Sequence, residues 1–373
     1  LIGLVGSEMC IRDSPCVNRI NNQINSIAYF EPFFMGVSDT LQDEINGQNI
    51  DMSFATDEEE KLDVKDSIEM KDITYAYPNT ERLIFDHADL KIPVGASVGI
   101  VGTSGAGKST VVDILLGLLE PSTGYIYADG VDVKETGNYR KWLKNIGYIP
   151  QMIFMLDDTI RKNVAFGVPE DKIDENRLWE VLKEAQLDEF IKTLPEGLET
   201  GIGERGIRLS GGQRQRICIA RALALNPEFV VCDEPVSALD VSVQAQIINL
   251  LKELQEKRNL TYLFISHDLS VVEHISDTIG VMYLGGLVET GTTSDIFANP
   301  LHPYTEALFS AIPMPDPDLK RKRIILEGNI PSPANPPKGC KFHTRCRKCM
   351  EICKNQVPEV KDMGNGHKVR CHL

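Results

Sequence analysis

One glycine-rich segment constrains this chain more than any other feature. Residues 97–101 form a short apolar, β-branched run, and the next eight residues, 102–109 (GTSGAGKS), match the pattern G-x-x-x-x-G-K-[ST]. In such a loop, glycines allow backbone N–H groups to surround phosphate oxygens, and the next helix directs its positive N-terminus at them. The segment therefore predicts a buried strand, a phosphate-binding loop (P-loop) and a helix over about residues 108–118, as in α/β proteins.

The P-loop assigns roles to individual side chains. Lys108 is expected to reach the β- and γ-phosphates of a nucleotide, and the Ser109 hydroxyl is expected to ligate Mg²⁺. By itself the motif indicates only a P-loop protein that binds a nucleotide with Mg²⁺, and ATP is the nucleotide implied by the family resemblance described below. The other residues predicted to contact the nucleotide in this segment are Gly102, Ser104, Gly105, Gly107 and Thr110.

A second motif supplies two carboxylates. The apolar run 229–232 ends in Asp233 and Glu234. Seen alone, an Asp-Glu pair after a strand is usually part of a solvated loop. With a P-loop upstream, Asp233 is expected to act at the Mg²⁺ ion. Glu234 is expected to position or deprotonate the attacking water.

Apolar runs alternate with helical patterns along the middle of the chain. Alternation over residues 68–75 predicts a half-exposed strand. Further strands are expected at residues 146–149, 229–232 and 262–265, and helices at about 176–187, 211–225 and 241–257. Because strands and helices alternate, we expect a parallel sheet that is covered by helices.

The deciding motif is the segment 209–213 (LSGGQ), which is followed by Arg-Gln-Arg. By itself it is typical of a flexible loop before a helix. Beside the P-loop and the two carboxylates, it resembles the signature of the ABC ATPase family. The resemblance implies two subunits arranged head to tail, in which N–H groups of this turn close on the γ-phosphate held by the other subunit. The residues assigned to this contact are Ser210, Gly211, Gly212 and Gln213.

Four further elements of that family occur in the expected order. The resemblance implies that Tyr77 stacks on adenine, and that Gln151 contacts Mg²⁺ or water and couples to a membrane partner. It also implies that Asp240 lines the dimer interface and that His267 contacts the γ-phosphate. The predicted catalytic residues are thus Glu234, His267 and Gln151, and the predicted Mg²⁺ ligands are Ser109, Gln151 and Asp233.

The resemblance also implies a fold class and a division of the chain. The expected fold is an α/β P-loop ATPase of the ABC type, with a mixed sheet core, an antiparallel β subdomain and an α-helical subdomain that carries the signature. We expect a leader and linker over residues 1–67, the ATPase domain over 68–300 and a Cys-rich C-terminal extension over 301–373. Residues 1–15 contain the string SEMCIRDS, which resembles translated sequencing-adapter sequence, and the alternative is a natural leader.

The two halves of the chain resemble different branches of the family. Residues 200–206 (TGIGERG) are similar to a loop of exporter ATPases of the lipid or lipid-linked sugar flippase type, and residues 16–50 to the end of an exporter's membrane domain. From about Ile217 onwards the chain is instead similar to oligopeptide/dipeptide importer ATPases, as in HPYT at 302–305 and the segment 339–346. We therefore hypothesise a chimera that is joined through the shared stretch SGGQRQRI.

The C-terminal extension holds five of the nine cysteines. In the importers that it resembles, four equivalent cysteines are associated with a [4Fe–4S] cluster. Thiolates in a reduced compartment suit iron–sulfur or zinc, but the spacing is neither a zinc ribbon nor a ferredoxin run. A cluster, zinc and free thiols are therefore all left open, with a structural role in each case. The four positions are Cys340, Cys346, Cys353 and Cys371.

Charge and hydropathy restrict the partners. The net charge of −15 argues against a nucleic-acid partner, which would need a basic surface. No run of 18 or more apolar residues occurs, so the membrane-spanning part is expected on separate permease subunits. With no secretory signal, we expect the chain at the cytoplasmic face of the membrane.

Together these features predict the ATP-hydrolysing subunit of an ABC transporter for oligopeptides or dipeptides. Its expected partners are a second ATPase subunit and transmembrane permease subunits. One alternative is the ATPase of a lipid or polysaccharide exporter. Another is a soluble ABC ATPase that acts on ribosomes or DNA, although such proteins typically carry two ATPase units or long inserts.

Overall fold

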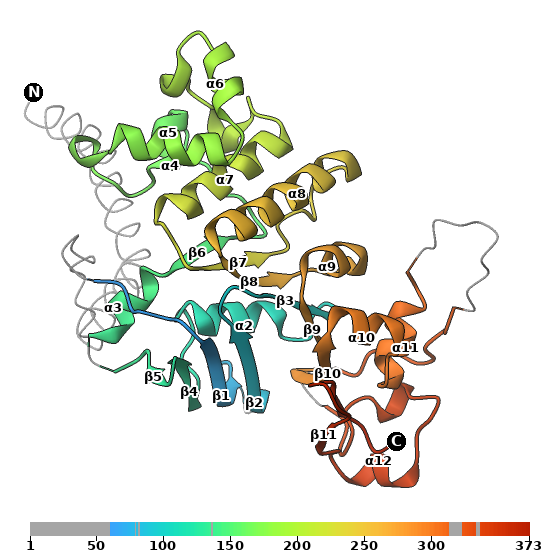
Figure 1. The fold of residues 1–373 in the computed structure, drawn as a ribbon. Helices are drawn as coiled ribbons and strands as arrows, with labels where there is room; N and C mark the ends of the chain where they lie inside the picture. Colours follow the sequence, from blue (N-terminus) through green and yellow to red (C-terminus); the bar gives the residue numbers. More distant parts are fainter. Residues whose placement is uncertain (1–59, 79, 81–82, 136, 313–322, 333–335) are drawn as a thin grey trace, which may run out of the picture. The chain divides into compact units, whose positions relative to one another are not determined.

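Two β-sheets and a set of helices make up the computed structural model of the protein (Figure 1). The structure describes residues 60–78, 80, 83–135, 137–312, 323–332 and 336–373. The segment 16–50, for which we expected the end of a membrane domain, lies outside these residues. Within them, no helix combines the length and the apolar character that crossing a bilayer requires.

The larger sheet has eight strands among the described residues, in the order β11-β12-β10-β9-β3-β8-β7-β6. The strands from β9 to β6 are parallel to one another, whereas β10, β12 and β11 are antiparallel and form one edge. The sheet is therefore mixed, as the sequence predicts. Its strands are β3 (Ser97–Gly102), β6 (Ile146–Ile149), β7 (Phe229–Asp233), β8 (Thr261–Ile265), β9 (Thr278–Tyr283), β10 (Gly286–Thr292), β11 (Val360–Asp362) and β12 (Lys368–Arg370).

The smaller sheet is antiparallel and has the order β2-β1-β4-β5. It confirms the predicted antiparallel subdomain. On β1, alternate side chains are buried, because one face of the strand packs on the core and the other faces outward. Its strands are β1 (Ser67–Ala76), β2 (Leu83–Pro93), β4 (Thr123–Ala128) and β5 (Val131–Asp132).

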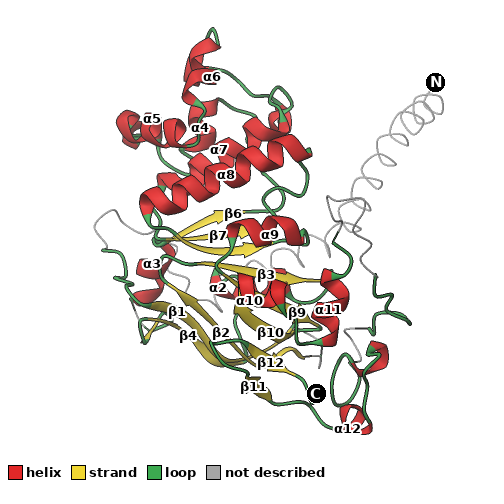
Figure 2. Ribbon diagram, turned by 45° about the vertical axis from the view of Figure 1, so that its right-hand side comes forward, coloured by secondary structure: helices red, strands yellow, loops and turns green. Residues whose placement is uncertain are grey.

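Helices cover the larger sheet, and a group of them stands above it (Figure 2). The four helices predicted near residues 108, 176, 211 and 241 are present, with ends that differ by a few residues at most. The helices are α2 (Lys108–Leu115), α3 (Asn138–Leu143), α4 (Ile160–Val164), α5 (Glu175–Glu184), α6 (Asp188–Thr193), α7 (Gly211–Ala224), α8 (Val241–Arg258), α9 (Leu269–Ile275), α10 (Thr293–Ala298), α11 (Pro303–Phe309) and α12 (Glu351–Asn355).

The parallel strands separate two hydrophobic cores. On β7, Val230 and Cys232 pack into the core on the side of the helices α5, α7 and α8, whereas Phe229 and Val231 pack into the core beneath the smaller sheet. Every residue of β7 is buried because both faces of the strand are covered. This explains why the central strands are continuous apolar runs in the sequence, which end abruptly at polar loops.

The C-terminal extension is joined to the larger sheet through a buried carboxylate. Strand β12 pairs with β10, with Val369 opposite Glu289. The Glu289 side chain is buried and accepts hydrogen bonds from His367 Nε2 at 2.7 Å and from the backbone N–H groups of Leu301 at 2.8 Å and His302 at 2.9 Å. A buried carboxylate is tolerated only with such partners. Two separate segments of the chain are thus fixed to one strand of the sheet.

His302 predicts a specific loss of stability in acid. Its buried imidazole accepts the Tyr304 N–H and caps α11, and burial lowers the pKa of His302 to about 4, against an opposing effect of Glu306. Since the unfolded chain has a pKa near 6.5, it binds more protons than the folded chain between those values. The contribution of the neutral His302 to the free energy of unfolding is therefore fully present above pH 6.5. About 3 kcal/mol of it should be lost as the pH falls to 4.

The variant His302→Asn isolates this effect because asparagine also caps helices but does not titrate in this range. Urea unfolding at pH 7 and pH 4 should show a smaller fall in the free energy of unfolding for the variant than for the wild-type chain. Equal falls would show that His302 is not the titrating group.

Candidate functional site

The P-loop connects β3 to α2. Its glycines are required by a close backbone contact at one position and by positive φ angles at two others. A Cβ atom on Gly102 would lie 2.3 Å from the backbone oxygen of Met282. Gly105 (φ 76°) and Gly107 (φ 101°) have backbone conformations that other residues rarely adopt. The loop can therefore curve tightly against β9 and present its N–H groups at the start of α2.

Lys108 lies against this loop. Its Nζ donates hydrogen bonds to the Gly102 oxygen at 2.9 Å and to the Thr103 oxygen at 3.1 Å. Burial lowers the pKa of Lys108, whereas the nearby Glu234 and Asp233 act in the opposite direction. A cationic group is thus held over the loop, between its carbonyl oxygens and the two carboxylates.

Two of the three predicted Mg²⁺ ligands, Ser109 and Asp233, are brought together, and the third, Gln151, bonds to Glu234. Asp233 ends β7, is buried, and forms a side-chain hydrogen bond with Ser109 at the start of α2. Burial raises the pKa of Asp233, and the charges of Glu234 and Asp113 add to this effect. A hydroxyl oxygen beside an electrostatically strained carboxylate is a donor set that fits Mg²⁺.

The three predicted catalytic residues also meet. Glu234 Oε2 accepts a hydrogen bond from Gln151 Nε2 at 3.0 Å and lies 3.1 Å from His267 Nδ1. His267 Nδ1 donates in this contact in the tautomer that carries its proton on Nδ1. These side chains come from the loops after β6, β7 and β8, which are neighbouring parallel strands, so their carboxyl ends lie at the same edge of the sheet.

The backbone at Glu234 is also unusual. Its φ is 46°, in the left-handed region that non-glycine residues seldom occupy. A hydrogen bond of 2.9 Å from the Glu234 N–H to the Ile265 oxygen stabilises this backbone conformation. Strained residues of this kind are concentrated at functional sites, where the surrounding structure fixes them.

Tyr77 lies beside the same site. Its hydroxyl is 3.1 Å from Thr110 Oγ1 on α2, its ring packs edge-on against Tyr75 with centroids 5.2 Å apart, and 41% of the residue is exposed. An exposed aromatic ring next to the P-loop helix is in a position where a nucleobase could stack on it.

The signature residues occupy a different place. Ser210 caps α7 and forms a capping box with Gln213, with bonds of 3.2 Å and 2.8 Å. A Cβ atom on Gly212 would lie 2.8 Å from Val243 on α8, and one on Gly211 would lie 3.0 Å from Leu239. In the described part of the chain, no hydrogen bond joins these residues to the P-loop.

Asp240 likewise serves as a helix cap. Its carboxylate accepts from the Val243 N–H at 3.0 Å and from the Ser242 hydroxyl at 2.7 Å, which fixes the start of α8. The hydrogen bond to Ser242 lowers the pKa of Asp240, so the group is ionised at neutral pH. Among the described residues, no hydrogen bond or ion pair joins Asp240 to the P-loop.

The cysteines of the extension do not form a recognisable metal site. Cys340 and Cys353 are joined through a backbone hydrogen bond of 2.8 Å. Burial raises the pKa of Cys340 to about 11, and the neighbouring thiols of Cys353, Cys371 and Cys346 add to this effect. However, the described residues contain no group of three or more His, Cys, Asp or Glu side chains arranged to hold a metal. The cluster and zinc interpretations therefore gain no support from the described residues.

One P-loop contact was not predicted from the sequence. The backbone N–H of Thr103 donates to Tyr304 Oη at 3.1 Å. The only signal in the sequence was the segment HPYT, which marked a family resemblance and carried no assigned role.

Comparison with known proteins is consistent with this geometry. Residues 85–237 match the family model described as ABC transporter, and residues 288–353 match the one described as Oligopeptide/dipeptide transporter, C-terminal region. The chain is 47% identical over 294 residues to the oligopeptide transport ATP-binding protein AppF of Bacillus subtilis, covering 77% of this chain and 88% of that protein. It is 42% identical over 307 residues to the oligopeptide transport ATP-binding protein OppF of Haemophilus influenzae, covering 81% of this chain and 91% of that protein.

A solved structure is similar as well. A bacterial Atm1-family ABC exporter with ATP bound has a TM-score of 0.59 and 31% sequence identity, and the match covers 71% of this chain and 45% of the exporter chain. The chain thus spans less than half of that exporter.

These matches do not support the chimera hypothesis. An alignment that covers 77% of 373 residues must include the proposed junction near Ile217. The similarity to AppF therefore runs across both supposed halves. The assumption of an exporter-like first half, made from residues 16–50 and 200–206, is not supported either.

Proposed function

The chain belongs to the family of oligopeptide-transport ATP-binding proteins of ABC transporters, and from this membership we propose that it hydrolyses ATP to drive oligopeptides through separate permease subunits. One observation carries the assignment of the site: Glu234, Gln151 and His267 converge from three loops beside the P-loop. Together they surround the place where a γ-phosphate and an attacking water would meet.

Each side chain has a role that follows from its position. Glu234 accepts the proton of the attacking water, and Gln151 and His267, which already bond to its carboxylate, hold that carboxylate in place. The ammonium group of Lys108 stabilises negative charge on the phosphate oxygens, where burial strengthens its effect. Mg²⁺, when bound, would neutralise phosphate charge, and Ser109 and Asp233 would hold it.

We propose that the active form contains two ATPase subunits. The capping box uses the N–H groups of Ser210 and Gln213, and the turn makes no hydrogen bond to the P-loop within the described chain. The N–H groups of Gly211 and Gly212, at the start of α7, would therefore serve a phosphate on a second subunit. Two apolar side chains near it support an interface: Ile207 is 79% exposed and Val241 is 82% exposed. Large exposed apolar side chains in one region are typical of interaction surfaces.

A permease contact is proposed at the loop that carries Gln151. Directly after it, Met152 is 86% exposed and Phe154 is 65% exposed. These apolar side chains are suited to docking against a membrane subunit, and their position next to Gln151 would let docking affect the catalytic carboxylate. We therefore propose that the chain acts at the cytoplasmic face of the membrane, bound to the permease subunits.

The proposal can be tested by reconstitution. The chain should be co-assembled in vesicles with the permease subunits of an oligopeptide importer, together with the peptide-binding protein. We expect ATP-dependent uptake of labelled peptide and stimulation of ATP hydrolysis by peptide. The variant Glu234→Gln provides the control, since it should assemble equally well and support no uptake. If the chain hydrolyses ATP but neither assembles with the permease nor responds to peptide, the peptide-transport assignment is wrong and the exporter alternative gains weight.

A further inference from the structure

The peptide unit between Gly102 and Thr103, at the start of the P-loop, is held from both sides. Its carbonyl oxygen accepts a hydrogen bond from Lys108 Nζ at 2.9 Å, and its N–H donates to Tyr304 Oη at 3.1 Å. Tyr304 lies 201 positions further along the chain, on α11 of the C-terminal extension.

We propose that Tyr304 is a positioning residue for ATP binding, through which the C-terminal extension sets the conformation of the P-loop. This rests on the proposed function in that the P-loop must bind the nucleotide. The residue does not contact the substrate itself. It acts on the peptide unit whose carbonyl oxygen accepts the hydrogen bond from Lys108 Nζ. Through this peptide unit it influences the position of the lysine that binds phosphate.

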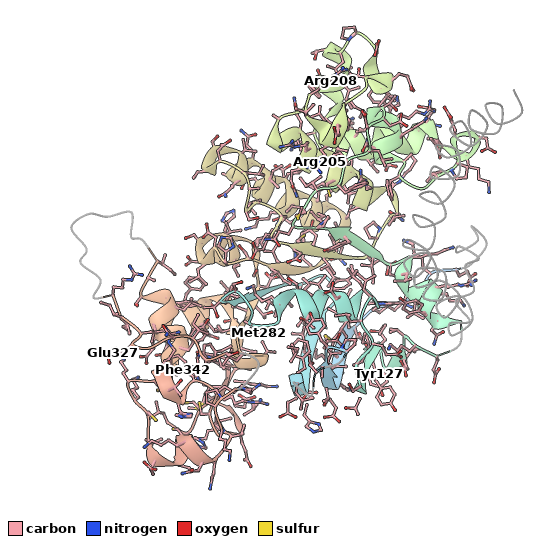
Figure 3. The ribbon with its side chains drawn as sticks, turned by 180° about the vertical axis from the view of Figure 1, so that it is seen from behind. Tyr127, Arg205, Arg208, Met282, Glu327 and Phe342 are labelled. Carbon is pink, nitrogen blue, oxygen red and sulfur yellow. The ribbon has the colours of Figure 1, made fainter. Side chains whose placement is uncertain are left out.

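The ring of Tyr304 is held firmly enough for this role. The residue is 1% exposed, and its ring centroid lies 4.7 Å from that of Tyr283 on β9 and 5.4 Å from that of Phe342 in the extension. Tyr283 and Phe342 also contact each other edge-on at 5.2 Å. Figure 3 marks Phe342 within the extension. Three mutually packed rings leave the Tyr304 hydroxyl little freedom to move.

The backbone of Tyr304 is fixed as well. Its N–H donates to the His302 side chain at 3.1 Å, and the His302 N–H donates to the buried Glu289 carboxylate on β10. His367, near the end of the chain, donates to the same carboxylate. A continuous series of contacts therefore leads from the last strands of the extension to the P-loop.

Simple core packing does not explain the hydroxyl. A phenylalanine would fill the same space between the two rings, whereas the phenol adds a bond to a P-loop amide. Tyr283 offers an internal comparison, because it lies in the same cluster and, among the described residues, its hydroxyl forms no bond to the P-loop. The two tyrosines thus share this packing, but of the two only Tyr304 bonds to the P-loop among the described residues.

The test is to compare Tyr304→Phe with Tyr283→Phe. Loss of one hydrogen bond to a backbone amide should weaken the binding of AMP-PNP with Mg²⁺ about five-fold and raise KM for ATP similarly, with kcat within two-fold of wild type. Tyr283→Phe should bind as the wild-type chain does. Calorimetric titration and steady-state kinetics give these numbers, and thermal unfolding shows whether either variant has lost stability.

A second variant tests whether the extension acts through this hydroxyl. Phe342→Leu loosens the packing of the Tyr304 ring without touching the P-loop, so it should weaken nucleotide binding in the wild-type background. In the Tyr304→Phe background it should have no further effect on affinity. An equal effect in both backgrounds, or wild-type affinity for Tyr304→Phe, would overturn the inference. Failure of the wild-type chain to bind nucleotide would instead overturn the proposed function, which separates the two outcomes.

Discussion

Replacing Glu234 by glutamine should reduce ATP hydrolysis by roughly 10²- to 10⁴-fold while leaving ATP binding nearly unchanged. The reason is that Glu234 is the only group in the Gln151–Glu234–His267 trio that is placed to accept a proton from water as a carboxylate. A glutamine has the same shape, and its single amide oxygen can keep the bonds that Glu234 Oε2 now accepts. The variant therefore removes the base without disturbing its neighbours.

The same variant should trap the bound nucleotide. With hydrolysis blocked, ATP and Mg²⁺ should convert the purified chain to a stable dimer on gel filtration, and the wild-type chain should return to the monomer as ATP is consumed. Hydrolysis is measured by phosphate release. A variant that retains more than about a tenth of the wild-type rate would show that Glu234 is not the base. A variant that binds ATP and stays monomeric would contradict the two-subunit proposal.

Four of the five parallel strands, β3, β6, β7 and β8, could be predicted because their signals are local, whereas β9 (Thr278–Tyr283) was not predicted. Strand β7 is a continuous apolar run, and its end is marked by two carboxylates, so both the strand and its site could be placed from residues 229–234 alone. Gln151 and His267 also follow apolar strands directly. Since parallel strands end at a common edge, their convergence on Glu234 follows from the topology.

The docking of the extension could not be predicted in the same way. Strands β11 and β12 have three residues each, which is too short for an alternating pattern to be seen. Glu289 occurs in the segment GLVETGT, where a charged residue would be predicted to be exposed. It is buried because its partners come from residues 301–302 and from His367, at a distance of 78 positions. The contact between Thr103 and Tyr304 is equally non-local.

Replacing Lys108 by methionine should weaken ATP binding by roughly two to three orders of magnitude. Removing one partner of a buried charge contact typically costs about 2–5 kcal/mol, and Lys108 is 8% exposed. Methionine has similar length and fits a buried site, so the P-loop should still form. Calorimetric titration with AMP-PNP and Mg²⁺ measures the effect. The control is Lys91→Met on β2, which removes an exposed lysine paired with Glu69 and should leave affinity unchanged.

The stability of the Lys108→Met variant tests whether the buried lysine, which is needed to bind the nucleotide, lowers the stability of the ligand-free protein. Burial lowers the pKa of Lys108, so its charged form is disfavoured in the fold, and a neutral side chain should not reduce the melting temperature of the ligand-free chain. Bound AMP-PNP should raise the melting temperature of the wild-type chain, because a ligand that binds only the folded state stabilises it, and this rise should be nearly absent in the variant. A strongly destabilised free variant would mean that Lys108 serves mainly to hold the P-loop through Gly102 and Thr103, and that its role toward phosphate is secondary.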